Sequence, residues 1–175
     1  MNGKKNISYG SEQIPEYLVD QLASGILPTF LPVSFVYEES RCLGVYHTEH
    51  FRTLASIEQI AIKDLLMIVC QLLTMLNENE KHYVFGETYQ IHVSTVYVDA
   101  LFSKVRMVFQ PLARLCTTKE QLTNLLQDCI PKVSEEGRPY LEDMIHYINR
   151  EEIGYFQAVR HGETLQNEIY LCDIT

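Results

Sequence analysis

The chain has 175 residues, 46% of them hydrophobic and 21% charged, which is enough material for one ordinary globular core. Its formal net charge is -9, and residues 134–175 carry nine acidic side chains against three arginines. An acidic surface repels phosphate backbones, so this composition excludes a role based on general nucleic-acid binding. We therefore expect one domain, spanning 1–175, with no nucleic-acid partner.

The cysteines and the N-terminal residues indicate the cellular compartment. No C-x-x-C pair occurs, and the number of cysteines is odd, which is typical of free thiols in a reducing environment. The first residues contain no apolar stretch of the kind that a signal peptide requires. We expect a cytoplasmic protein with five free thiols, at Cys42, Cys70, Cys116, Cys129 and Cys172.

Residues 1–56 predict a small part that carries a sheet. Asn6–Tyr9 is a short predicted strand that ends at Gly10-Ser11. Residues 14–25 predict a helix with Pro15 in its first turn and Gly25 as its C-cap. The apolar residues at helical spacing in this segment are Ile14, Tyr17, Leu18 and Leu22.

A hairpin and a short extension follow this helix. Residues 33–47 alternate strand-forming residues on both sides of a turn at Glu39-Ser40. Residues 51–54 are expected to extend the same sheet. Ser56 and Gln59 have the spacing of a capping box, which predicts that a helix starts nearby.

Residues 63–76, KDLLMIVCQLLTML, predict the central helix of the domain. Only four of these fourteen residues are polar, so the helix should be covered on most sides. About 20 consecutive apolar residues are needed to cross a membrane, so we expect no membrane insertion. The face predicted to be most buried comprises Leu65, Leu66, Val69, Leu72, Leu73 and Leu76.

Residues 57–175 predict a mainly helical part with one hairpin, near 93–110. The hairpin strands are 96–98 and 104–109, joined by a turn at 100–103. Together with the first sheet, this predicts an α+β fold in which a small antiparallel sheet and a mainly helical part pack around the central helix.

Three further helices are predicted after the hairpin. Thr118 and Gln121 have the spacing of a capping box, and Pro131 should stop the helix that follows. A second helix starts at Ser134, with apolar residues at 140, 141, 144, 145 and 148 on one face. A third spans 151–170, with Gly162 as a possible break and an apolar face of Ile153, Phe156, Val159, Leu165 and Ile169.

Candidate catalytic residues occur singly. Ser94 or Thr95 lies near His92, and Cys42 lies near His47. On a strand, Thr95 and Cys42 would face away from their histidines, whereas Ser94 shares a face with His92. The sequence offers no evident acid to orient His92 as a base.

Two histidines and three tyrosines are the other candidates, for metal binding and for a contact surface. His47 and His50 lack cysteine or carboxylate partners at ligand spacing, so we expect no metal and no cofactor. Tyr83, Tyr89 and Tyr97 lie near the second hairpin, and such residues more often line the edge of a core than a contact surface.

Three segments resemble parts of protein kinases. ILPTFLPVSFVYEESRCLGVYHT resembles strands of the small lobe, KDLLMIVCQLLTML resembles a core helix of the large lobe, and IHVSTVYVDALFSKVRMVFQP resembles the catalytic loop and its hairpin. The same phrases resemble an uncharacterised bacterial domain of Firmicutes that precedes forkhead-associated modules. That domain is distantly similar to the cytoplasmic pseudokinase domain of a type VII secretion membrane component. The resemblance implies a truncated pseudokinase-like architecture.

The chain departs from a working kinase at the positions that matter for chemistry. A kinase requires a glycine-rich loop, a strand lysine, a catalytic Asp and metal-binding Asn and Asp residues. The resemblance places Gln90 at the catalytic Asp, Thr95 at the metal-binding Asn and Thr88 at the His of the catalytic loop. Phe109, Gln110 and Pro111 stand at the D-F-G motif. No glycine-rich loop occurs in the sequence, and no strand with the lysine precedes the first helix. The resemblance therefore implies a protein that is not an enzyme, namely an interaction or scaffolding module of a cytoplasmic signalling or secretion-associated protein. The alternatives are a small-molecule sensor that uses the cleft between the two parts, and an enzyme of another type.

Overall fold

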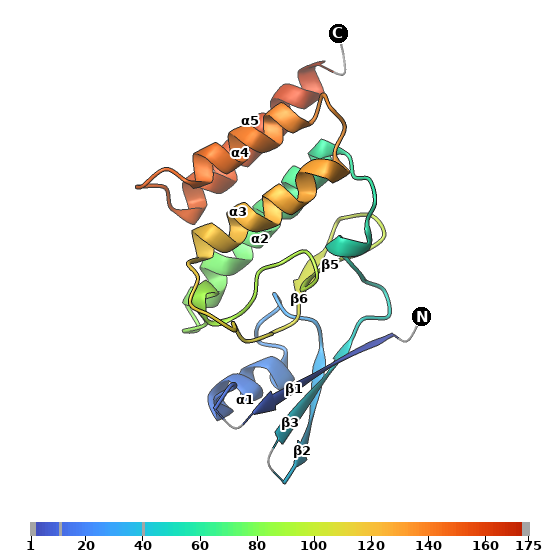
Figure 1. The fold of residues 1–175 in the computed structure, drawn as a ribbon, viewed down its shortest axis with the longest axis vertical. Coiled ribbons are helices and arrows are strands. Elements are labelled where there is room, and N and C mark those ends of the chain that lie inside the picture. The colour runs from blue at the N-terminus through green and yellow to red at the C-terminus, as the bar shows by residue number, and fades with distance from the viewer. Residues whose placement is uncertain (1–2, 11, 40, 173–175) are drawn as a thin grey trace.

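The computed structural model describes residues 3–10, 12–39 and 41–172, and in this part of the chain five α-helices and two three-stranded antiparallel sheets form an α+β fold (Figure 1). The predicted fold class is confirmed. Figure 1 shows the first sheet at one end of the molecule and the last two helices at the other. The predicted strand break at Ser11 and turn residue Ser40 lie outside the described residues.

The first sheet consists of β1 (Lys4–Gly10), β2 (Val33–Glu38) and β3 (Arg41–His47) in the order β1-β3-β2. The predicted strand and hairpin are confirmed, and β3 is central because both other strands pair with it. Side chains of β3 alternate between buried and partly exposed, as expected for a strand with one face on a core.

Helix α1 (Glu16–Ser24) packs beside this sheet and ends at Gly25, whose φ of 71° is the left-handed conformation that favours glycine at a C-cap. The predicted cap is confirmed. The predicted apolar face is wrong at Tyr17, which is 53% exposed, because the buried face consists of Leu18, Val19 and Leu22.

Residues 51–54 do not extend the first sheet as predicted. The amide of Phe51 donates to the carbonyl of Thr48, and this turn redirects the chain. Strand β4 (Arg52–Thr53) then pairs with β5 in the second sheet. The predicted capping box at Ser56 is also wrong, because the Ser56 hydroxyl donates to the Thr53 carbonyl and helix α2 begins only at Ile62.

Helix α2 (Ile62–Glu80) is the central helix, longer than the predicted 63–76. All six residues of the predicted buried face are buried, and Ile68 and Asn79 join them. Figure 1 shows α2 between the pair formed by the last two helices and the second hairpin. A helix contacted on so many sides needs the nearly continuous apolar surface that its sequence provides.

The second sheet is completed by β5 (Val96–Val98) and β6 (Val105–Met107). The predicted hairpin near 93–110 is confirmed, although its second strand ends two residues early, at Met107. One edge of β6 pairs with β5. The opposite edge pairs with the segment around Phe30, because Met107 exchanges backbone hydrogen bonds of 2.8 Å with Thr29 and Leu31. This pairing ties the N-terminal part to the helical part.

The remaining helices are α3 (Thr118–Cys129), α4 (Arg138–Ile148) and α5 (Tyr155–Cys172), and a 3₁₀ turn with Pro131 ends α3 as predicted. The capping box is one residue earlier than predicted, at Thr117 and Glu120. Helix α5 continues through Gly162 without the considered break. Its predicted face is wrong at Phe156, which is exposed, whereas Ala158 and Gly162 are buried.

Candidate functional site: the loop from residue 86 to 95 and the junction beneath it

Phe109 lies at the centre of the junction between the first sheet and the helical part. Its ring centroid is 5.6 Å from that of Tyr89, 6.0 Å from that of Phe30 and 6.3 Å from that of Tyr9. All four side chains are buried. The interior of the junction is therefore filled by aromatic rings at ordinary packing distances.

Two tyrosine hydroxyls from the first sheet bind the backbone of Phe109. The Tyr9 hydroxyl donates to the Phe109 carbonyl at 2.6 Å, and the Phe109 amide donates to the Tyr46 hydroxyl at 3.3 Å. The two hydroxyl oxygens are 2.7 Å apart. Burial raises the pKa of Tyr46 to about 12 and raises the pKa of Tyr9 as well, so both stay neutral at physiological pH.

A second buried network crosses the same junction. The Thr29 hydroxyl donates to Asn79 Oδ1 at 2.7 Å, and Asn79 Nδ2 donates to the Tyr89 hydroxyl at 3.0 Å. Thr29 lies between α1 and β2, Asn79 lies near the end of α2, and Tyr89 precedes β5. Because buried polar groups are costly unless they are paired, this network fixes the relative position of three segments.

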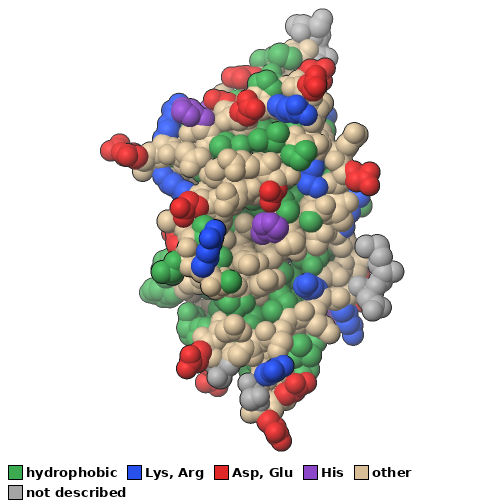
Figure 2. Space-filling view, in the orientation of Figure 1, with side chains coloured by type: hydrophobic (Ala, Val, Ile, Leu, Met, Phe, Trp, Pro, Cys, Tyr) green, Lys and Arg blue, Asp and Glu red, His purple; other side chains and the backbone are tan. Residues whose placement is uncertain are grey.

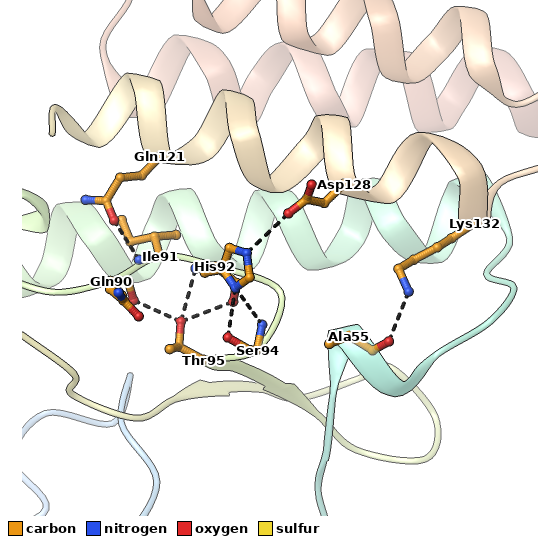
Figure 3. Close-up of polar contacts among 9 residues, drawn as sticks. All are labelled: Ala55, Gln90, Ile91, His92, Ser94, Thr95, Gln121, Asp128 and Lys132. Carbon is orange, nitrogen blue, oxygen red and sulfur yellow. Dashed lines mark hydrogen bonds and ion pairs between the residues drawn. The ribbon is translucent and has the colours of Figure 1, made fainter. Parts of the chain in front are cut away.

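The positions that correspond to kinase catalytic groups are used inside the loop itself. The Thr95 hydroxyl donates to the Gln90 carbonyl at 2.9 Å and accepts from the His92 amide at 3.0 Å (Figure 3). Thr95 is 1% exposed. The Gln90 amide donates to the carbonyl of Gln110 at 2.7 Å, and the Thr88 hydroxyl donates to the Phe85 carbonyl. The hydroxyls of Thr88 and Thr95 therefore help to close the loop, whereas the two Gln90 groups bonded here are its backbone carbonyl and backbone amide.

Helix α3 holds the loop from above. Gln121 Oε1 accepts from the Ile91 amide, and Gln121 Nε2 donates to the Gly86 carbonyl, both at 2.8 Å. The Thr118 hydroxyl donates to Glu87 Oε1 at 2.8 Å. Thr118 and Gln121, predicted to cap the helix, instead bind the loop, which explains why the cap falls on Thr117 and Glu120.

Lys132 anchors the segment that leads into α2. Its Nζ donates to the carbonyl of Ala55 at 3.1 Å (Figure 3). It also donates to the carbonyl of Ile57 at 2.6 Å. Lys132 lies in the 3₁₀ turn directly after α3. This turn holds the connection into α2, while α3 itself holds the loop.

His92, Ser94 and Asp128 form a hydrogen-bonded series. His92 Nδ1 is 2.8 Å from Ser94 Oγ, and His92 Nε2 is 3.3 Å from Asp128 Oδ2 (Figure 3). The prediction that no acid orients His92 is therefore wrong. Asp128 was missed because it lies on α3, far along the chain, and only the docking of α3 brings it to the histidine.

The surroundings of Ser94 differ from those of a catalytic serine. The Ser94 amide donates to His92 Nδ1 at 3.2 Å, and the next amide, of Thr95, donates to the His92 carbonyl at 2.9 Å. Both amides that could form an oxyanion hole are thus already used. The His92 and Asp128 side chains are each 48% exposed, so water competes with their pairing.

The other sequence candidates are not brought together. Cys42 is buried on β3, whereas His47, on the other face of the strand, has Nε2 3.5 Å from the Ser34 hydroxyl. Of the tyrosines, Tyr89 and Tyr97 are buried, as predicted for a core edge. Tyr83 is 75% exposed, with a positive φ of 60°.

Within residues 3–10, 12–39 and 41–172, no group of three His, Cys, Asp or Glu side chains is placed to hold a metal ion. In the same part of the chain, no helix has the length and apolar character needed to cross a membrane. Comparisons with protein-family models and with curated proteins find no match for this chain.

Proposed function

We propose that this domain is a non-catalytic interaction or scaffolding module of a cytoplasmic signalling or secretion-associated protein. The observation that carries the proposal is the filled junction: Phe109 is covered by three aromatic rings, and its backbone is bound by two tyrosine hydroxyls. Nucleotide-dependent phosphoryl transfer requires metal-binding and phosphate-binding groups that face a cleft. Here Phe109 is apolar and buried, and the hydroxyls of Thr88 and Thr95 are bonded to nearby backbone carbonyls. Gln90 and Gln110 are uncharged, so they offer no carboxylate for a metal ion.

Exposed apolar side chains support a role in binding proteins. Figure 2 shows acidic side chains from one end of the visible face to the other, with basic side chains and groups of hydrophobic side chains between them. Large hydrophobic residues that remain exposed include Tyr83, Phe85, Leu115 and Phe156. Exposed apolar groups within a polar surface are a common feature of protein interfaces.

The alternative of a small-molecule sensor that uses a cleft between the two parts draws no support from a junction filled by Phe109 and its neighbours. The alternative of a hydrolase based on Ser94 and His92 draws limited support from Asp128, but the neighbouring amides are occupied.

The proposal is tested by finding partners in the source cells and measuring binary affinity with purified components. Phe85→Ser and Phe156→Ser remove exposed apolar surface, and Leu101→Ser is a matched control on the β5–β6 turn, where Leu101 is 79% exposed. We expect at least one of the first two substitutions to weaken binding about tenfold or more, since central apolar anchors dominate interface energies. A partner that binds all three variants equally would contradict an interface that includes Phe85 or Phe156. Finding no partner at all would contradict the proposed function.

A further inference from the structure

A pocket of about 310 Å³ lies within the helical part, away from the filled junction. Its walls come from α2, α3, the end of α4, the start of α5 and the 3₁₀ turn Gly86–Thr88. The apolar lining residues are Leu73, Leu122, Ile148, Ile153 and Ala158. This volume is at the lower limit of small-molecule sites, roughly 300 to 1,000 Å³, and is large enough to admit an aliphatic side chain.

One end of the pocket carries negative charge. Glu87 is part of the lining, and its Oε1 accepts from the Thr118 hydroxyl. The hydroxyl of Tyr155, also in the lining, donates to Glu80 Oε1 at 3.0 Å. Burial raises the pKa of Tyr155, and the nearby carboxylates of Glu80 and Glu87 raise it further. A cationic group near Tyr155 would therefore be favoured.

The lysine in the lining is already engaged. Lys119 Nζ donates to the carbonyl of Arg150 at 2.7 Å and lies 3.4 Å from the carbonyl of Glu151. It thereby holds the loop between α4 and α5, which supplies Ile153 and Gly154 to the pocket wall. Lys119 keeps its positive charge, but these bonds hold its ammonium at the loop between α4 and α5, whereas Glu80 and Glu87 are the carboxylates near Tyr155.

Three exposed apolar residues are close in the sequence to residues of the pocket lining. Phe85, Leu115 and Phe156 are 43%, 97% and 67% exposed, and each lies within two residues of a lining residue. A free small molecule gains little from apolar groups outside its pocket. A polypeptide that places one side chain in the pocket would cover them, and burial of this surface would favour binding.

We infer that this pocket anchors an aliphatic side chain of a protein partner, and that a Lys or Arg beside it in the partner's chain pairs with Glu87. The inference rests on the proposed interaction function and names the partner's chemistry. It combines an apolar pocket, exposed apolar residues adjacent in the sequence to its lining, and carboxylates near Tyr155 with the net charge of -9. The complementary partner segment is basic and amphipathic.

The test uses three acetylated and amidated dipeptides as probes: leucyl-lysine, leucyl-glutamine and leucyl-glutamate. Binding is followed through the NMR methyl signals of Ile148 and Ile153. We expect all three at about 10 mM to shift these signals, since contacts of this size correspond to dissociation constants of about 1 mM or weaker. The lysine probe should bind about two- to fivefold more tightly than the glutamine probe, and the glutamate probe most weakly.

Two charge-removing variants make the test specific. Glu87→Gln should abolish the difference between the lysine and glutamine probes and leave the glutamine probe unaffected. Glu58→Gln, which removes an exposed carboxylate ahead of α2, should change neither probe. Melting temperatures of both variants should match that of the wild type, so that a loss of binding is not a loss of folding.

The outcomes separate this inference from the proposed function. If no probe shifts the Ile148 and Ile153 methyl signals, the pocket is not an anchor site, while an interaction module that uses another surface still stands. If the glutamate probe binds as tightly as the lysine probe, or Glu87→Gln keeps the preference, the assigned cationic neighbour is wrong. Failure of the proposed function would appear in the partner search, which does not use these probes.

Discussion

Gly162 of α5 lies so close to Cys70 of α2 that a Cβ added at position 162 would be 2.6 Å from the Cys70 sulfur. The thiol is fixed there, since its sulfur is 3.6 Å from the Val159 carbonyl and 3.8 Å from Gln166 Nε2. The glycine is therefore needed for space at a crossing of two helices.

We predict that Gly162→Ala destabilises the protein by about 1 to 3 kcal/mol through overpacking. An unstrained Gly→Ala change in a helix would instead add about 1 kcal/mol. Urea unfolding measures the change, and Cys70→Ala in the same chain should recover part of the loss. If Gly162→Ala were stabilising on its own, the close approach of α2 and α5 would be wrong.

Tyr9→Phe tests the hydroxyl that binds the first sheet to Phe109. The substitution leaves the buried Phe109 carbonyl with a poorer partner, so we expect a loss of about 1 to 3 kcal/mol in the free energy of unfolding. Tyr37→Phe, at a position 69% exposed, is the matched control and should stay within about 0.5 kcal/mol of the wild type. Equal stabilities of the two variants would show that the hydrogen bond from Tyr9 to the Phe109 carbonyl does not stabilise the junction.

Leu72→Ala tests the central position of α2. Leu72 is fully buried midway along the helix, and truncating a buried leucine typically costs about 2 to 5 kcal/mol. Leu101→Ala, at a largely exposed position, should cost far less. An unchanged melting temperature for Leu72→Ala would contradict the assignment of α2 as the centre of the core.

Thiol reactivity depends on pH through the thiolate fraction. Burial raises the pKa of Cys70 to about 11 and that of Cys129 to about 12. Only about a thousandth or less of either thiol is ionised at pH 8, so both should alkylate far more slowly in the folded protein than in urea. Mass spectrometry after iodoacetamide treatment measures this. In urea without reductant all five cysteines should react, and a count of three or fewer would reveal a disulfide and contradict a cytoplasmic location.

Local patterns predicted the elements well, because hydrophobic period and turn residues act over short distances. The α2 face and the Gly25 cap are examples. The capping box shows where local signals become ambiguous: Thr117 with Glu120 and Thr118 with Gln121 have the same spacing. The choice depends on Ile91 and Gly86, which bind Gln121 and lie in another segment.

Contacts between distant segments could not be predicted in this way. Strand β4 has two residues, too few for a periodic signal, and its partner strand lies more than 40 residues later. The approach of Asp128 to His92 and the close packing at Gly162 depend on how α3 and α5 dock. The candidate site depends on contacts of this kind, such as that of Asp128 with His92 and that of Tyr9 with Phe109, so it was less predictable than the fold.

We propose that the domain does not use nucleotide, because the position of Phe109 is sealed, the Thr95 hydroxyl is bonded within its loop, and Gln90 is uncharged. Thermal unfolding with and without millimolar MgATP tests it most directly. A ligand at about 100 times its dissociation constant adds roughly 2.7 kcal/mol, which for a domain of this size raises the melting temperature by roughly 2 to 4 °C per kcal/mol. We predict no change beyond the scatter of the measurement. A reproducible, magnesium-dependent rise of several degrees that is lost on substitution of Gln90 or Thr95 would contradict the account.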